Sequence, residues 1–254
     1  MMKIDLSNRV ALVTGATGEL GRVIARTLGE CGADVAVHYF KNKEGAEKLC
    51  AEITAMNVRA FPVHADVGSR EEIMRMREIV HERLGAPAII VNNAVSQYPW
   101  VSVLEQAPED YESQFRTCVM HNVLMAQIFV PAMIERRFGR VIAINTECAM
   151  QNLPNQSAYV SGKRGMDGVL RVLAREIGAH QITVNQVAPG WMISDRQRGT
   201  PEEVQIGYSS GVPLRRRGYD QDIANAVAFL ASDLAAFITG AYIPVCGGNV
   251  MPAI

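Results

Sequence analysis

Cysteine is scarce in this sequence, and the five cysteines present are poorly placed for cross-links. Cys31, Cys50, Cys118, Cys148 and Cys246 are odd in number and form no C-x-x-C pair. A disulfide framework and a zinc site are therefore not expected, and free thiols are typical of a reducing compartment. We predict no metal site.

The chain also has no large excess of positive or negative charge. The 25 Lys and Arg against 26 Asp and Glu leave a net charge of −1, so we expect neither nucleic acid nor an anionic membrane as a partner. The basic run Arg215–Arg217 is more typical of a solvated turn than of a nucleic-acid patch. No apolar run approaches the roughly 20 residues of a membrane span, and the N-terminus lacks a secretory signal pattern. We therefore expect a soluble, cytoplasmic protein.

Short apolar runs instead alternate with longer amphipathic ones along the 254 residues. Strands are predicted at residues 9–15, 33–40, 59–67, 87–94, 139–146, 182–190 and 239–245. Helices are predicted at 21–32, 43–57, 69–85, 111–137, 157–178 and 222–237, the third with Ser69 as N-cap and Glu72 as its capping-box partner. Strict alternation predicts one α/β domain over 1–254, a doubly wound parallel sheet of about seven strands with helices on both faces.

One segment breaks this alternation. Residues 191–214 are long and mixed in polarity, and they separate the sixth strand from the last helix. Long loops inside compact domains are often functional. A substrate loop at about 190–213 and a plain pair of short surface helices are both compatible with the pattern.

The stretch "TGATGELG" at 14–21 follows the first strand and opens the first helix. Gly15, Gly18 and Gly21 permit a tight turn and a close approach of the backbone to a pyrophosphate, at a helix N-terminus that favours anions. The placement predicts a dinucleotide-binding loop, although the sequence is also compatible with an ordinary strand–helix turn. Glu19 is a carboxylate within this loop.

The second strand is followed by cations rather than by an acid. Enzymes that bind NAD usually carry Asp or Glu there, whereas this strand reaches Tyr39 and continues into Lys41 and Lys43, with Arg22 nearby in the first helix. Cations without an acid favour a 2′-phosphate, hence NADP(H) over NAD(H). Ordinary surface lysines remain the alternative.

The stretch "YVSGK" places Tyr159 and Lys163 four residues apart, on one face of a predicted helix. A free tyrosine is a poor acid–base catalyst near neutrality, and a neighbouring ammonium is expected to lower the pKa of the phenol. Taken alone, this spacing would equally suit a surface pair.

Further motifs occur in the same chain: "ADV" at 65–67, "NNA" at 92–94, "HNV" at 121–123, "GRVIAINT", "VNQVAPG", and "FLASDLAAFITG" running into "CGG". Together with "TGATGELG" and "YVSGK", they resemble the short-chain dehydrogenase/reductase family over essentially the whole chain. The likeness is greatest to the single-domain branch that includes 3-oxoacyl-carrier-protein reductases. The resemblance implies a Rossmann-type fold.

The resemblance also implies catalytic roles for four residues. Tyr159 would be the general acid or base at a carbonyl or alcohol, and Lys163 would tune it and bind the nicotinamide ribose. Asn122 would hold a water in the proton relay. Thr146 stands where the family usually has serine; its hydroxyl keeps the oxygen-stabilising role available.

The cofactor residues implied are Gly15, Thr17, Gly18, Glu19, Leu20, Gly21, Tyr39, Lys41, Asp66, Val67, Asn93, Ala94, Tyr159, Lys163, Pro189, Gly190, Met192 and Ser194. Asp66 and Val67 would flank the adenine ring. Ser194 stands where a threonine often binds the nicotinamide carboxamide.

The chain departs from the family pattern at several positions. Val95 replaces a glycine and should crowd the cleft, and Cys246 replaces an aspartate, which should affect a C-terminal or subunit contact. The glycine spacing is that of the larger, extended branch, so Glu19 occupies a variable position. Its side chain is expected to point into solvent or toward the substrate.

The resemblance implies an NADP(H)-dependent oxidoreductase that acts on a small carbonyl or alcohol and assembles as a homotetramer or homodimer. A nucleotide-binding regulatory or scaffold protein with little turnover is the alternative, and isomerase or dehydratase chemistry is a third. Six residues flank the strand ends and border either the substrate pocket or the core: Tyr98, Trp100, Met150, Gln151, Trp191 and Met192.

Overall fold

The computed structural model describes residues 4–194 and 206–252, and one parallel sheet organises them. Its strands are β1 (Val10–Val13), β2 (Asp34–Tyr39), β3 (Ala60–His64), β4 (Ile89–Asn92), β5 (Gly139–Ile144), β6 (Ile182–Pro189) and β7 (Tyr242–Val245). Their order is β3-β2-β1-β4-β5-β6-β7, and every neighbouring pair is parallel. The predicted doubly wound sheet is confirmed.

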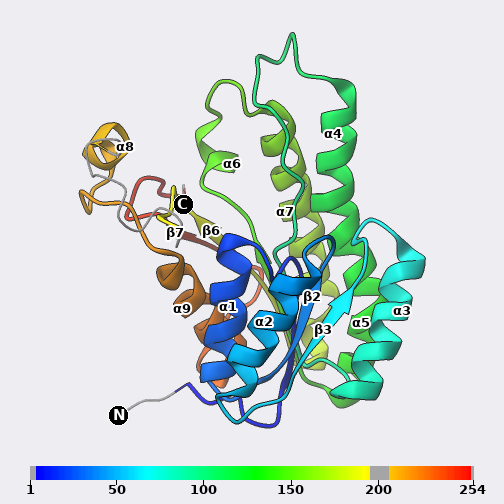
Figure 1. The fold of residues 1–254 in the computed structure, drawn as a ribbon. Helices are drawn as coiled ribbons and strands as arrows, with labels where there is room; N and C mark the ends of the chain where they lie inside the picture. The colour runs from blue at the N-terminus through cyan, green and yellow to red at the C-terminus, as the bar shows by residue number, and fades with distance from the viewer. Residues whose placement is uncertain (1–3, 195–205, 253–254) are drawn as a thin grey trace.

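Helices cover both faces of this sheet (Figure 1). One face carries α1 (Glu19–Glu30), α2 (Lys43–Thr54) and α9 (Asp220–Ala231), which is followed by a short 3-10 turn, η5 (Asp233–Ala235). The other carries α3 (Arg70–Arg83), α5 (His121–Arg136) and α7 (Ser157–Ile177), the last followed by the 3-10 turn η2 (Gly178–His180). The crossovers of a parallel sheet thus bury both of its faces, which explains the nearly continuous apolar strands.

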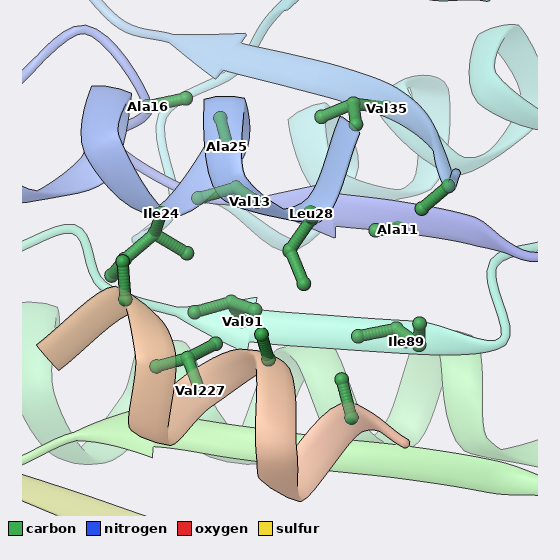
Figure 2. Close-up of a cluster of buried hydrophobic side chains, with 14 of the residues drawn as sticks. Ala11, Val13, Ala16, Ile24, Ala25, Leu28, Val35, Ile89, Val91 and Val227 are labelled. Atoms are coloured by element: carbon green, nitrogen blue, oxygen red, sulfur yellow. The ribbon is translucent and has the colours of Figure 1, made fainter. Parts of the chain in front are cut away.

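Two hydrophobic clusters, one on each face, form the core. In the first cluster, Ile24 and Leu28 of α1 point toward the sheet, where Val91 of β4 and Val227 of α9 meet them (Figure 2). All four residues are 0% exposed. This packing fixes α1 across β1 and β4, and so fixes the loop that precedes it.

The order of the strands reverses direction between β1 and β4. β1 pairs with β2 on one side and with β4 on the other, where Ala11 lies opposite Ile89 and Val13 opposite Val91. Connections leave these two strands toward opposite faces, which opens a crevice beyond their carboxyl ends. The structure therefore places the glycine loop at the position where such sheets bind ligands.

The helix predicted at 111–137 is one continuous helical segment of three parts. It runs through α4 (Pro108–Gln114), a π-helical stretch η1 (Phe115–Met120) and α5, and it ends at Arg137 in the left-handed conformation. By length and composition alone, Pro108–Arg136 is apolar enough to cross a membrane. Of its most apolar window, 56% is buried inside the fold, as in a core helix.

Several local features differ from the sequence predictions. The short helix α6 (Cys148–Gln151) was not predicted, and the last helix ends at Ala231 rather than at 237. The short helix α8 (Ile206–Gly211) lies within 191–214, where short surface helices were one of the two alternatives. Ser69 does cap α3 by accepting from the Glu72 backbone, but the Glu72 carboxylate accepts from the backbone of Asp66 instead of returning to Ser69. Within the expected substrate loop, residues 195–205 lie outside the described part.

Candidate active site

Two adjoining cavities lie at the carboxyl edge of the sheet. The larger cavity, about 830 Å³, is lined by the glycine loop and by residues that follow several strands. The side cavity, about 440 Å³, lies next to it. Both are lined by Ser96, Gln97, Thr146, Tyr159 and Gly190, which therefore stand at the junction of the two.

Glycine is required at two positions of the loop that walls the larger cavity. Gly15 has a φ of +62°, and a Cβ on it would lie 2.9 Å from the Cα of Ala94. A Cβ on Gly21 would lie 2.2 Å from the carbonyl oxygen of Gly15. Because α1 begins at Glu19, its first N–H groups lie beside this bare backbone. Such a wall suits the pyrophosphate of a dinucleotide.

Glu19 lies within this wall but is paired. Its carboxylate forms an ion pair with Arg22, with 3.2 Å between Oε2 and Nη2 and 31% of each side chain exposed. The carboxylate also sits at the positive end of the helix dipole. Glu19 lines the larger cavity and is absent from the side cavity, so the expectation that it reaches toward the substrate is not met.

The end of the larger cavity remote from the junction is formed after β2 and β3 by Phe40, Lys41, Asn42, Asp66 and Val67. Tyr39, predicted to bind the cofactor, does not line it. Side chains alternate along a strand, so His38 and Phe40 face the cavity while Tyr39 packs against the first core cluster. Lys41 is the cation that this end presents.

A buried histidine, which the sequence analysis did not single out, connects the loop to the sheet. His38 Nδ1 accepts from the backbone N–H of Gly15 at 2.9 Å, and its Nε2 lies 2.9 Å from the carbonyl of Ala65. Burial lowers the pKa of His38 to about 4. The neutral imidazole therefore accepts from the glycine loop and donates to the chain just after β3.

At the junction, α7 brings the predicted catalytic pair together. Lys163 Nζ lies 5.7 Å from the centroid of the Tyr159 ring and donates to the carbonyl of Ile144 at 2.6 Å. Trp100 stacks on the Tyr159 ring at 5.7 Å, and the Tyr98 hydroxyl accepts from the Tyr159 backbone N–H at 2.5 Å. The segment before α4 thus fixes the tyrosine from the side of the side cavity.

The expected lowering of the Tyr159 pKa by Lys163 is not found in the folded chain. Burial raises the pKa of the Tyr159 phenol above its ordinary value, and the Thr146 hydroxyl opposes that shift. Burial also lowers the pKa of Lys163, whose ammonium donates to a backbone carbonyl. The folded chain therefore does not show the predicted lowering of the phenol pKa: desolvation dominates, and the effect opposing it comes from the Thr146 hydroxyl rather than from Lys163.

Asn122, the fourth predicted catalytic residue, lies behind the junction. It is 2% exposed and lines neither cavity. Its Oδ1 accepts from Asn92 Nδ2 at 2.7 Å and its Nδ2 donates to the carbonyl of Cys118 at 2.6 Å, directly after the π-helical stretch. π-Helical insertions are frequent near functional sites. A role for Asn122 in holding a water stays a prediction.

The other predicted cofactor residues divide clearly. Those that line the larger cavity are Gly15, Thr17, Gly18, Glu19, Leu20, Gly21, Lys41, Asp66, Val67, Asn93, Ala94, Tyr159, Lys163, Pro189 and Gly190. Val95 also lines this cavity, and its crowding of the cleft stays a prediction. Met192 packs against the first core cluster, and Ser194, the last residue before the undescribed segment, does not line either cavity.

Five aromatic side chains line the side cavity: Tyr98, Trp100, Tyr159, Trp191 and Tyr208. Of the six predicted border residues, Tyr98, Trp100, Gln151 and Trp191 line it, whereas Met150 and Met192 do not. The sequence analysis missed seven residues of this lining: Ser96, Gln97, Glu147, Cys148, Leu153, Gln156 and Tyr208. Among the described lining residues, Glu147 is the only one with a formal charge. Its place directly after Thr146 was the signal that could have identified it.

A larger cavity at the reversal point of a parallel sheet, joined to a second cavity by hydroxyl side chains, defines the class of dinucleotide-binding oxidoreductases. Within that class the chain belongs to the short-chain dehydrogenase/reductase family: the family model described as enoyl-(acyl carrier protein) reductase matches residues 15–249. The seven-stranded parallel sheet agrees with this assignment.

Known relatives are similar over nearly their full length. The chain is 36% identical over 244 residues to a 3-oxoacyl-[acyl-carrier-protein] reductase of Staphylococcus epidermidis, covering 96% of this chain and 100% of that one. A protein of the same name from Pseudomonas aeruginosa is 36% identical over 248 residues, covering 98% and 100%. A solved 7α-hydroxysteroid dehydrogenase, complexed with NADH and 7-oxo glycochenodeoxycholic acid, superposes with a TM-score of 0.90 at 29% identity, covering 98% and 97%. The chain is accordingly an oxidoreductase of the hydride-transfer type.

Proposed function

We propose that this protein is an NADP(H)-dependent reductase or dehydrogenase whose proton-transfer residue is Tyr159. The observation that carries the proposal is the junction: Tyr159 and Thr146 line both cavities, and Lys163 lies against the tyrosine ring. A hydroxyl pair at that boundary can reach a substrate oxygen in the side cavity and stay beside a cofactor in the larger one.

Each residue of the junction then has a distinct task. The bound nicotinamide supplies or accepts the hydride. Tyr159 protonates the carbonyl oxygen during reduction; its raised pKa keeps the phenol protonated at neutral pH. The Thr146 hydroxyl donates to the same oxygen as charge develops. Lys163 orients the ring and binds the ribose. Asn122, held by Asn92 and the Cys118 carbonyl, would hold a water of the proton relay behind the junction.

NADP(H) is the cofactor we propose, on the chemistry of the far end of the larger cavity. Phe40, Lys41 and Asn42 follow β2 there, and none of them is an acid that would bind a ribose 2′-hydroxyl. Lys41 supplies the positive charge that a 2′-phosphate requires. Glu19 is compensated by Arg22 and is thereby compatible with the pyrophosphate.

The substrate we propose is a small carbonyl compound, or the matching alcohol, that fits an aromatic cavity of about 440 Å³. We also propose a homotetramer, or a homodimer, in the cytoplasm. Phe115 and Val172 support the assembly, because both are exposed apolar side chains on helices that pack together. Neither nucleic acid nor membrane is proposed as a partner.

The decisive test is the loss of NADPH absorbance with a panel of carbonyl compounds: acetoacetyl-CoA, ethyl acetoacetate and cyclohexanone. For any compound that is reduced, Tyr159→Phe should lower kcat by about 10²- to 10⁴-fold, because it removes the general acid. Binding of NADPH should be unchanged. Tyr111→Phe is the matched control, since it removes a hydroxyl bonded to Ser157 outside both cavities.

Other outcomes decide between the alternatives. Turnover that survives Tyr159→Phe would remove the tyrosine from the mechanism. Binding of NADPH without turnover of any compound would favour a nucleotide-binding regulatory or scaffold protein. Conversion of an alcohol without net change of NADPH would favour isomerase or dehydratase chemistry.

A further inference from the structure

Glu147 is a buried carboxylate at the centre of the site for which the proposed reaction has no use. It follows Thr146 directly, lines the side cavity and is 3% exposed. Its backbone N–H donates to the carbonyl of Pro189 at 2.9 Å, which ties the ends of β5 and β6 together. Burial raises the pKa of its carboxyl group. A buried acid without a function would only cost stability, so its contacts need an explanation.

Both carboxylate oxygens accept hydrogen bonds from segments far away in the sequence. Tyr208 of α8 donates its hydroxyl to Oε1 at 2.7 Å, and Asn249 of the C-terminal segment donates its amide to Oε2 at 3.0 Å. The Tyr208 hydroxyl also accepts from the backbone N–H of Trp191 at 3.0 Å, and the two rings meet edge to face at 5.6 Å. One carboxylate therefore connects the ends of β5 and β6, α8 and the C-terminal segment.

The backbone around this network leaves room for it at two points. A Cβ on Gly190 would lie 2.5 Å from the Tyr208 hydroxyl, so glycine is needed there for the tyrosine to reach Glu147. Gly247, with a φ of +64°, would place a Cβ 2.7 Å from Val212, just after α8. The carbonyl of Gly247 also accepts from the backbone of Leu214 at 3.1 Å. Figure 1 shows α8 on the side of the molecule where β7 and the segment that follows it lie.

We propose that Glu147 is a positioning residue that fastens α8 and the C-terminal segment onto the wall of the side cavity, and that it thereby sets the shape in which substrate is bound. It acts through Tyr208, which lines that cavity itself. The kinetic part of this inference rests on the proposed reductase function, whereas the structural part stands without it.

A carboxylate is the group that the network needs, because Tyr208 and Asn249 both approach with donors. Glu147→Gln keeps the size of the side chain but replaces one acceptor oxygen with an amide donor. One of the two hydrogen bonds is then lost, and a donor faces a donor. Tyr208→Phe removes the same link from the other side while keeping the ring against Trp191.

The first measurement is amide hydrogen exchange of the peptide 206–214, followed by mass spectrometry in the full chain. Loss of one hydrogen bond of about 1 kcal/mol should accelerate exchange by about 5-fold in Glu147→Gln, and more in Glu147→Ala. Tyr208→Phe also removes the acceptor of the Trp191 N–H, so it should accelerate exchange at least as much as Glu147→Gln, and the double variant should be no faster than the faster single one. Tyr111→Phe, a loss of a tyrosine hydroxyl elsewhere, should leave this peptide unchanged.

The second measurement is kinetic, with whichever carbonyl compound of the panel is reduced. Glu147→Gln should raise its KM by about 5- to 10-fold, with kcat and the KM for NADPH each within about 2-fold of the unmodified protein. Glu147→Asp, which restores both acceptors on a shorter stem, should recover part of the loss. Equal changes in the KM of both ligands would overturn the positioning role, as would an unchanged KM in spite of faster exchange.

The two measurements distinguish a failure of the proposed function from a failure of the inference about Glu147. If no compound is reduced, the proposed function fails, and the exchange data alone decide whether Glu147 fastens α8. If exchange of 206–214 stays within about 1.5-fold of the unmodified protein in both Glu147→Gln and Glu147→Ala, the inference is overturned whatever the turnover shows.

Discussion

At the scale of single residues, we expect the choice between NADP(H) and NAD(H) to depend on Lys41. Lys41 lines the larger cavity where the strand β2 has ended, and its ammonium lies 5.8 Å from the centroid of the Phe40 ring. A cation at that position favours a phosphate over a hydroxyl by charge. Its neighbour Lys43 is different, because it is the first residue of α2 and pairs with Glu47 at 3.6 Å.

Lys41→Ala should therefore weaken the binding of NADPH much more than the binding of NADH. A charge-assisted hydrogen bond contributes about 1.5–3 kcal/mol, so the KM for NADPH should rise by roughly 10-fold or more. The KM for NADH should change by less than about 2-fold, and steady-state kinetics with each cofactor measures both.

Lys43→Ala is the control for Lys41→Ala, because it removes the same charge two residues further along the chain. It should leave the ratio of the two KM values unchanged. If Lys41→Ala raised both KM values equally, a role in recognising the 2′-phosphate would be refuted.

At the scale of elements, the seating of α1 on the glycine loop determines both stability and the cofactor wall. Gly21 is the third residue of α1, and a methyl group on it would meet the Gly15 carbonyl at 2.2 Å and Asn93 Nδ2 at 2.8 Å. The Asn93 amide donates to the carbonyls of Thr14 and Gly15 at 2.9 and 3.2 Å. An added methyl group would therefore displace the helix from the loop.

Gly21→Ala should lower the free energy of unfolding by about 1–3 kcal/mol, the usual cost of overpacking. Affinity for NADPH should fall with it. Urea unfolding and fluorescence titration of the cofactor measure the two effects.

Gly168→Ala, in the interior of α7, is the matched control for Gly21→Ala. Nothing lies within 4 Å of a Cβ placed on Gly168, so alanine should stabilise α7 by up to about 1 kcal/mol. If both variants lost the same stability, close packing at Gly21 would not be the cause.

Much of the element order could be predicted from the sequence, and the physical reason is periodicity. Buried strands such as β1 are apolar on both faces and lie between turn residues, and α7 has a clear apolar face. The short helices α6 and α8, of 4 and 6 residues, leave no such period. Their positions depend on contacts with distant segments, which no local pattern encodes.

In the site too, residues within a sequence motif could be predicted, whereas properties that depend on the folded chain could not. Tyr159, Lys163 and Thr146 could be predicted because family motifs carry them, and all three line the larger cavity. Tyr39 was misplaced relative to that cavity because the pleat of β2 reverses the side chain at each residue. The raised pKa of Tyr159 could not be foreseen, since burial is a property of the folded chain rather than of the four-residue spacing.

At the scale of the whole molecule, buried histidines couple the fold to pH. Burial lowers the pKa of His38 to about 4 and that of His121 to about 3. Because these values lie below the usual value near 6.5, the neutral imidazole is favoured in the fold. The stability gained is fully present above pH 6.5 and is lost as the pH falls toward 4.

Between pH 7 and pH 5 the contribution of His38 alone should fall by about 2 kcal/mol. His38→Asn should remove that part of the pH dependence, so its free energy of unfolding should decrease less over this interval than that of the unmodified protein. Urea unfolding at the two pH values is the measurement.

His81→Asn, on the exposed side of α3, is the control for His38→Asn and should retain the full decrease between the two pH values. An identical decrease in His38→Asn and the unmodified protein would show that protonation of this imidazole is not coupled to unfolding.

The reversal of strand order between β1 and β4 also has a consequence for biosynthesis. The first wall of the larger cavity, Thr14–Gly21, emerges from the ribosome early, but its opposite side needs Asn93, Thr146 and Tyr159 from much later in translation. Nascent chains that end before β6 have no complete nucleotide pocket. The dinucleotide therefore binds only molecules whose two halves have been synthesised and joined, and stabilises finished products rather than early folding intermediates.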